Sequence, residues 1–316
     1  MDFECSKNET GIRIDKYVGN SDLKIIIFAK LNKLPVIKKL GDYKFFVEKN
    51  GNLYLEQPTW IEDSNSGKLV CMELLTLREN LKAIEFPDFV TEIGSHAFSY
   101  CEKLLVVEIP DSIKIIDSAA FIWCTSLNFV ELSDSVTEIR GRSFSNCYSL
   151  KTARLSNSMS MIHGYTFENC FRLEKVELPS CVKIIGYSAF KNCTSLKSVK
   201  FPHSLEEIDS AAFCRCESLE WIRIPASVEK IGEGAFKGCE NLSSIKISEG
   251  VIEIGNGAFR GCKNLEKIKL PASVKKIGSN AFRGCINLTT VELPTFAEIG
   301  RDAFRGCPAS LKIIHY

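Results

Sequence analysis

The chain has 316 residues, of which 45% are apolar and 25% are charged, the ordinary composition of a soluble folded protein. Its 40 Lys and Arg residues nearly balance its 39 Asp and Glu residues, which argues against a nucleic-acid binder that relies on bulk charge and against a polybasic membrane anchor. No run approaches about 18 consecutive apolar residues, so the sequence predicts no transmembrane helix and no membrane insertion.

The N-terminus shows no targeting segment. The sequence from Met1 to Cys5 opens with no basic segment, and no apolar segment or small-residue cleavage site follows it. No signal peptide is therefore visible, and we expect a cytoplasmic protein. The chain has 14 cysteines, which a secreted protein would use for disulfides. In a cytoplasmic protein we expect them to be reduced, buried packing residues.

Two hairpins are predicted in the first part of the chain. Asn50-Gly51 separates the apolar segments 45–47 and 53–55, which is a strong signal for a two-residue hairpin turn, and 64–67 favours a looser second turn. We predict that residues 1–74 form a β-rich N-terminal cap with a hairpin insert at 46–74. Trp60 of this insert is either a core residue of the cap or an exposed contact.

The remainder, 75–316, is organised as about ten units of 23 residues, which indicates a repeat fold. The repeated phenylalanines are Phe98, Phe121, Phe144, Phe167, Phe190, Phe213, Phe236, Phe259, Phe282 and Phe304. Three residues after each lies a cysteine: Cys101, Cys124, Cys147, Cys170, Cys193, Cys216, Cys239, Cys262, Cys285 and Cys307. A leucine follows three residues later, from Leu104 to Leu288, and one residue later still, at Leu311, in the last unit.

Each piece of the unit, A-F-x-x-C-x-x-L-x-x-V-x-L-P-x-x-V-x-x-I-G-x-x, predicts one local structure. L-x-x-V-x-L ends in a period of two, which is typical of a short strand, and the Pro ends that strand. V-x-x-I-G predicts a second short extended segment. A-F-x-x-C-x-x-L has three-residue spacing, which predicts a helical turn with Phe, Cys and Leu facing inward.

One such unit cannot bury its apolar face alone, whereas stacked units bury it in ladders of identical residues. We therefore predict a leucine-rich-repeat solenoid. Its parallel β-sheet forms the concave face, and short strands and helical turns form the convex side. Segment 311–316 supplies a last strand, and Lys312 and His315 give its free edge mild protection against pairing.

The unit resembles the BspA-like, treponemal-type leucine-rich repeat of 23 residues, strongly over about residues 81–316. The resemblance implies adhesion to host matrix proteins and cells, and coaggregation, as in members from host-associated bacteria and parasitic protists. It therefore implies association with the cell surface, which the absence of a visible leader does not favour.

Catalytic and metal-binding patterns are absent from the sequence. The four histidines occupy different repeat positions: His96, His163, His203 and His315. No nucleophile elbow, zinc-protease motif or phosphate-binding loop is present. Cys214 and Cys216 form the one close cysteine pair, with no second pair at zinc-finger spacing. We expect no enzyme, no cofactor and no metal.

The outward positions of the predicted strands are the candidate binding site, because residues that flank an inward Val and Leu point away from the core. They are acidic and apolar in the first units and basic around Trp221. The candidate partner-binding residues on this concave face are Phe129, Arg154, Lys200, Trp221, Arg223, Lys246, Lys267 and Lys269. A merely solvated strand face is the alternative interpretation.

The leading functional hypothesis is a non-enzymatic scaffold that binds a protein partner, acidic in character, through this face, with adhesion or host interaction as its use. The alternative is an intracellular regulator or inhibitor of an acidic enzyme or phosphorylated partner. A weaker one is binding of RNA or an anionic polysaccharide by the Lys/Arg stretch with Trp221. Nucleic acid is not the expected partner, and the sequence predicts no oligomeric state.

Overall fold

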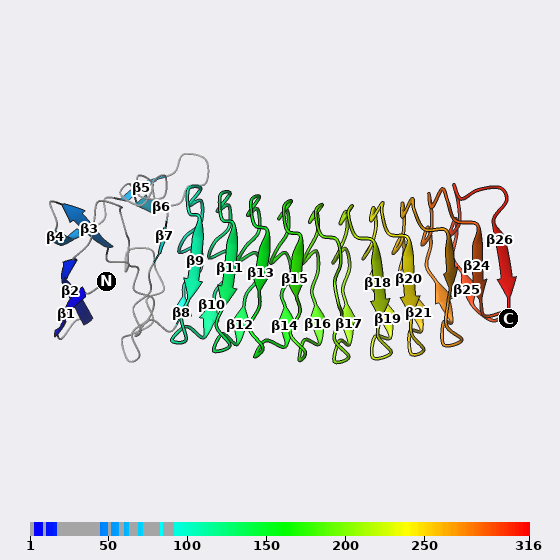
Figure 1. Cartoon of the computed structure of the whole chain (residues 1–316), viewed down its shortest axis with the longest axis horizontal. Helices are drawn as coiled ribbons and strands as arrows, with labels where there is room; N and C mark the ends of the chain where they lie inside the picture. Colours follow the sequence, from blue (N-terminus) through cyan, green and yellow to red (C-terminus); the bar gives the residue numbers. More distant parts are fainter. Residues whose placement is uncertain are drawn as a thin grey trace.

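The computed structural model describes residues 92–316 continuously and, before them, seven separate strands (Figure 1). The early strands are β1 (Phe3–Asn8), β2 (Gly11–Tyr17), β3 (Phe45–Lys49), β4 (Asn52–Glu56), β5 (Trp60–Glu62), β6 (Leu69–Cys71) and β7 (Ala83–Ile84). β3 pairs antiparallel with β4, with Lys49 opposite Asn52, and β5 pairs antiparallel with β6. These pairings are the ones expected of the two predicted hairpins. The predicted boundary at residue 74 and the side chain of Trp60 lie outside the described residues.

From β7 onward the longer strands stack in parallel, one per unit except in the unit of Phe190 (Figure 1). They are β9 (Val106–Ile109), β11 (Phe129–Leu132), β13 (Thr152–Arg154), β15 (Lys175–Glu177), β18 (Trp221–Ile224), β20 (Ser244–Ile247), β22 (Lys267–Lys269), β24 (Thr290–Leu293) and β26 (Lys312–His315). Ser198 bridges β15 to β18 through isolated parallel bridges to Lys175 and Trp221. The predicted solenoid of about ten turns is confirmed.

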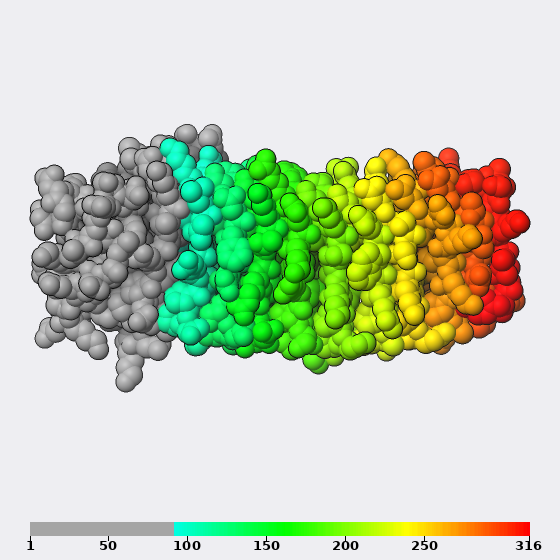
Figure 2. Space-filling model, in the orientation of Figure 1, coloured from blue at the N-terminus to red at the C-terminus, as the bar shows by residue number. Residues whose placement is uncertain are grey.

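Shorter strands form a second parallel row, at the apolar-x-x-Ile segment of each unit. They are β8 (Glu92–Ile93), β10 (Ile115–Ile116), β12 (Glu138–Ile139), β14 (Met161–Ile162), β16 (Ile184–Ile185), β17 (Glu207–Ile208), β19 (Lys230–Ile231), β21 (Glu253–Ile254), β23 (Lys276–Ile277) and β25 (Glu298–Ile299). In the space-filling view the units from residue 92 onward appear as successive bands across the molecule, in chain order (Figure 2).

The period of the sequence sets the register of both rows. Val107 lies opposite Val130, and Ile231 lies opposite Ile254, each pair one unit apart along the chain. In the last unit Val291 lies opposite Ile313, because that unit is one residue shorter. Each side chain therefore stacks on its equivalent in the next unit, so the core consists of ladders of like residues.

The phenylalanine ladder is the centre of the core. Consecutive rings from Phe98 to Phe304 are stacked, with centroids 5.2–5.7 Å apart and planes within 2–12° of parallel. These distances exceed the strand spacing of about 4.8 Å, which is consistent with offset rather than face-to-face stacking. Phe98 through Phe282 are at most 1% exposed, whereas Phe304 of the last unit is only partly buried.

The cysteine ladder joins each unit to the one before it. From Cys124 to Cys307, each thiol donates a hydrogen bond to the backbone carbonyl oxygen of the phenylalanine in the preceding unit, at 3.2–3.4 Å. Cys124, Cys147 and Cys170 are buried and unbridged, as predicted. Burial raises the pKa of these thiols, so they stay protonated and remain donors.

The segment around each phenylalanine is not helical, which differs from the predicted helical turn. It consists of consecutive turns, each closed by a hydrogen bond between residues three apart. Examples are the bonds from the N–H of Ser99 to the carbonyl of His96 and from the N–H of Cys101 to that of Phe98. The residues two before and two after the phenylalanine have φ between 53° and 77° in all ten units, and such left-handed residues interrupt a helix. No helix able to span a membrane occurs in the described part of the chain.

Candidate functional site

The outward residues of the longer strands, together with Ser198 and Lys200 of the unit between β15 and β18, form one surface, here called the sheet face. Along β18 burial alternates residue by residue: Ile222 and Ile224 are buried, whereas Trp221 and Arg223 are exposed. Trp221 has 45% of its surface exposed, a large fraction for an indole. The structure therefore gives Trp221 and Arg223 the outward orientation that the alternation predicts.

The basic residues of the sheet face are aligned across neighbouring units. Arg223 lies opposite Lys246 in the pairing of β18 with β20. Ser198 bridges to Trp221, which places Lys200, two residues further on, beside Arg223. Lys200, Arg223 and Lys246 are therefore successive members of one row, separated by the strand spacing of about 4.8 Å.

Ion pairing divides the predicted site residues into two groups. Arg154 is 3.0 Å from Glu131 across strands, and Lys269 is 3.2 Å from Glu292. In contrast, the four exposed cations Lys200, Arg223, Lys246 and Lys267 form no ion pair with any residue that the structure describes. We call these four residues and Trp221 the cationic cluster.

Small neighbours leave the indole of Trp221 accessible. Ser198 and Ser244 occupy the equivalent positions in the units on either side. The two serines carry the smallest side chains in this part of the row, so no bulky neighbour within the row covers the indole. An exposed aromatic residue beside cations is a common anchor of protein interfaces.

Two predicted residues do not join the cationic cluster. Phe129 is half-buried in β11, four units before Trp221, which corresponds to about 19 Å at the strand spacing. Arg154 lies three units before Arg223 in the same row and is held by carboxylates. The structure therefore brings together only the later members of the predicted set.

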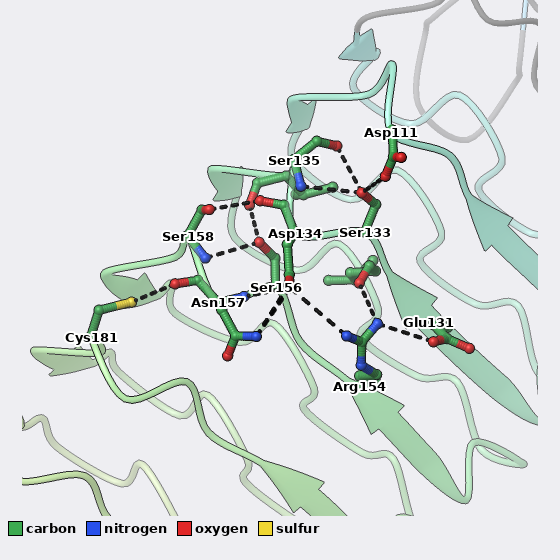
Figure 3. A network of polar contacts seen from close by, with 12 residues as sticks. Asp111, Glu131, Ser133, Asp134, Ser135, Arg154, Ser156, Asn157, Ser158 and Cys181 are labelled. Carbon is green, nitrogen blue, oxygen red and sulfur yellow. Dashed lines mark hydrogen bonds and ion pairs between the residues drawn. The ribbon is translucent and has the colours of Figure 1, made fainter.

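A polar network accounts for the position of Arg154 (Figure 3). Asp134 accepts hydrogen bonds from the backbone N–H of Asn157 at 3.0 Å and from its side-chain amide at 3.2 Å, and these bonds lower the pKa of Asp134. The carboxylate of Asp134 is 4.0 Å from the guanidinium of Arg154, which also binds Glu131. Arg154 is thus part of a structural network and not a free cation.

An aromatic ladder that was not predicted from the sequence lies on the turn segments of the first four units. Tyr100 stacks on Trp123 with centroids 6.1 Å apart, Trp123 meets Tyr148 edge-on at 5.5 Å, and Tyr148 stacks on Phe171 at 5.0 Å. Tyr100 is 51% exposed. The signal was present as aromatic residues two or four positions after the repeated phenylalanine.

A groove of about 660 Å³ lies over the shorter strands of the central units, lined by Glu206, Glu207, Asp209 and Glu229 among others. The charged residues of its lining are these four carboxylates and Lys230, so its net charge is opposite to that of the cationic cluster. Within the described part of the chain, no group of three or more His, Cys, Asp or Glu side chains is placed to hold a metal ion.

Parallel strands in stacked turns, with leucine and valine ladders inside, define the protein as a leucine-rich-repeat solenoid. The chain belongs to the BspA type leucine-rich repeat family, whose model of six repeat copies matches residues 76–197 and 183–312. No curated protein matches the chain in sequence.

Several solved structures resemble the chain. A leucine-rich repeat protein from Eubacterium ventriosum has a TM-score of 0.52 and 18% identity, with 85% of this chain and 75% of that one covered. A leucine rich cell surface protein from Faecalibacterium prausnitzii has a TM-score of 0.45 and 25% identity, with 99% and 93% covered. The T. pallidum leucine-rich repeat protein has a TM-score of 0.46 and 28% identity, with 66% and 87% covered. The E. ventriosum protein shares the fold.

Proposed function

We propose that the protein is a non-enzymatic interaction scaffold that binds an acidic protein partner through the cationic cluster of the sheet face. The observation that carries this proposal is the row Lys200, Arg223 and Lys246, which forms no ion pair with a described residue and lies beside the exposed indole of Trp221.

Electrostatics favours an acidic partner. Like charges directly opposite each other on neighbouring strands destabilise a sheet, and Arg223 and Lys246 occupy such positions. Elsewhere on the same face a glutamate of the next or the preceding unit neutralises the cation, as Glu131 does for Arg154. Carboxylates supplied by a partner would neutralise the cationic cluster in the same way. The resulting ion pairs would strengthen as water is excluded around Trp221.

Membership of the BspA type family supports an adhesive use of this surface, with the protein associated with a cell surface. A second candidate is an intracellular regulator of an acidic enzyme or phosphorylated partner. The many free, buried thiols favour it, because unpaired cysteines are typical of reducing compartments. The comparisons lend no support to a cytoplasmic location, so the partner decides between the two.

The test compares three proteins in capture experiments from host-cell and own-cell lysates, followed by affinity measurements with the purified partner. The first is wild type, and the second is Trp221→Ala/Arg223→Glu. The third, Tyr100→Ala/Arg172→Glu, makes matched changes on exposed residues of the turn segments. An acidic protein that the second variant loses and the third retains supports the proposal, and its binding should weaken steeply with salt. A partner bound equally by all three would overturn it.

A further inference from the structure

A second basic row lies on the turn segments, away from the sheet face. In the last four units the residue directly after the repeated phenylalanine is Lys237, Arg260, Arg283 or Arg305. In the first four units the same position holds Ser99, Ile122, Ser145 and Glu168. The fifth unit has Lys191, which forms an ion pair with Glu168 at 2.9 Å, and the sixth has Cys214. A continuous row of cations therefore occurs only in the last four units and is no requirement of the repeat.

Beside these cations the next position is glycine in all four units: Gly238, Gly261, Gly284 and Gly306. Their φ angles of 75–77° lie in the left-handed region. They stack directly on one another, since a Cβ added at Gly261 would lie 3.9 Å from the Cα of Gly238. We call this row of bare backbone with its four flanking cations the turn track.

Left-handed geometry alone does not explain four successive glycines. The equivalent residues Asn146, Asn169 and Asn192 adopt φ of 61–63°, and Tyr100 and Trp123 adopt 63–64°. Side chains are thus compatible with this position, although glycine adopts its backbone most readily. In the last four units their absence opens a strip along which a ligand can approach the backbone closely.

The charges that flank this strip are largely uncompensated. Lys237 and Arg260 are exposed and form no ion pair with a described residue. Arg283 donates a hydrogen bond to the neutral amide oxygen of Asn280 at 3.3 Å. Arg305 alone of the four has a carboxylate within reach, Asp302 at 3.6 Å.

We propose that the turn track binds a linear anionic polysaccharide that carries one acidic group per sugar. The cations repeat once per unit, at about 4.8 Å along the solenoid. A sugar of an extended 1,4-linked chain advances by close to this distance, so successive acidic groups meet successive cations. The bare glycine strip accommodates the pyranose rings.

Other polyanions match this spacing less well. Side chains on one face of an extended peptide repeat at about 6.6–6.8 Å, and phosphates along one strand of a DNA duplex rise by about 3.4 Å. Single-stranded nucleic acid is usually held by stacking of bases on aromatic side chains, and the turn track has none. The polysaccharide is therefore the ligand class that fits both the period and the lining.

The first experiment titrates wild-type protein with oligogalacturonates, from dimer to octamer, by isothermal calorimetry. Because the turn track has four cations, we expect the affinity for oligogalacturonate to rise with each sugar up to about the tetramer or pentamer and then to level off. Uncharged cello-oligosaccharides of equal length test whether binding requires the acidic groups. Oligoglutamate and single-stranded DNA of equal charge test whether binding requires a sugar chain. Equal or tighter binding of oligoglutamate or DNA, or no dependence on chain length, would overturn the proposal.

Two variants locate the site without disturbing the repeat. Lys237→Ser/Arg260→Ser introduces the residue found naturally at Ser99 and Ser145, and should weaken binding roughly tenfold by the loss of two exposed ion pairs. Gly261→Asn/Gly284→Asn keeps a residue type that tolerates left-handed φ but fills the strip, and should weaken binding by a similar factor.

The control is Arg223→Glu on the sheet face. The cations there have the same period but no row of glycines beside them, so this variant should bind oligogalacturonate as wild type does. Loss of binding in this control, or unchanged binding in both turn-track variants, would contradict the assignment. Circular dichroism and urea unfolding verify that each variant is folded. Because the acidic protein partner is assigned to the sheet face, the two proposals can fail separately.

Discussion

The Sγ atom of Cys193 donates a hydrogen bond to the backbone carbonyl oxygen of Phe167, at a distance of 3.2 Å. The same oxygen accepts the N–H of Cys170 within its own unit, also at 3.2 Å. One carbonyl thus serves both the turn of its own unit and the attachment of the next unit. The repeated cysteine is therefore both a small apolar residue and a donor between units.

Replacement of a ladder thiol should destabilise the solenoid in proportion to its burial. Cys193→Ala removes the hydrogen bond and leaves a small void, and should lower the free energy of unfolding by about 1–2 kcal/mol. Cys307→Ala, in the partly exposed last unit, should cost less. Urea unfolding of the two variants against wild type measures this. Because both thiols donate the same hydrogen bond, equal losses would show that burial does not set the cost.

The thiol ladder should make the protein sensitive to alkaline pH. Burial raises the pKa of Cys285 from 9.0 to about 12, and it also raises the pKa of Cys147 and Cys193. Each thiol has a higher pKa in the folded than in the unfolded state, so its contribution to the free energy of unfolding is complete below about pH 8.5–9 and is lost as pH rises toward the folded pKa. Over that range each thiol lowers the free energy of unfolding by about 1.4 kcal/mol per pH unit.

Urea unfolding of wild type and Cys285→Ala between about pH 8 and pH 11 tests this dependence. The variant lacks one such thiol, so its stability should fall less steeply above pH 9, by about 1.4 kcal/mol per unit. Tyrosine and lysine titrate in the same range in both proteins, so the difference between the two slopes isolates the thiol. Identical slopes would contradict the prediction.

Gly250 is expected to be irreplaceable. Its φ is 119°, and a Cβ there would lie 2.0 Å from the carbonyl oxygen of Ala226. Gly250→Ala should therefore destabilise the protein by about 3 kcal/mol or more, because the clash is with backbone. Gly257→Asn is the matched control: φ is 57°, and the nearest atom is 3.8 Å away, so the cost should stay within about 1 kcal/mol. Thermal unfolding ranks the two.

The cationic cluster should show opposite effects on stability and binding. Lys246→Glu places a carboxylate opposite Arg223, which should leave stability unchanged or raise it by up to about 1 kcal/mol. The same change should abolish capture of the acidic partner. If the variant were less stable and still bound the partner, the row would be a structural feature only.

The fold could be predicted from the sequence because each core position recurs at a fixed period. The inward direction of Phe190, Cys193 and Leu196 follows from their spacing, and the structure confirms their burial. The turn segments could not be predicted correctly, because three-residue spacing suits both a helical turn and a series of separate turns. Left-handed geometry at Tyr100 and Trp123 has no sequence signal, since aromatic residues rarely adopt it.

The candidate site was predicted only in part. Alternation along a strand gives the outward direction of Trp221. It does not reveal that Arg154 is neutralised while Arg223 is not, because that depends on contacts between units. The turn track was missed for another reason. Its cations lie one residue after the repeated phenylalanine, and the spacing of Phe and Cys does not show which of the two residues between them faces solvent.

The identical spacing of the phenylalanine, cysteine and strand ladders has an evolutionary consequence. Because each unit contacts mainly its two neighbours, duplication or loss of a whole unit leaves the ladders intact, whereas a gain of a few residues does not. Duplication or loss of a unit that carries these cations therefore lengthens or shortens the proposed rows by one charge each. Copy number of such units would in this way be a heritable control on the length of ligand that the proposed sites accept.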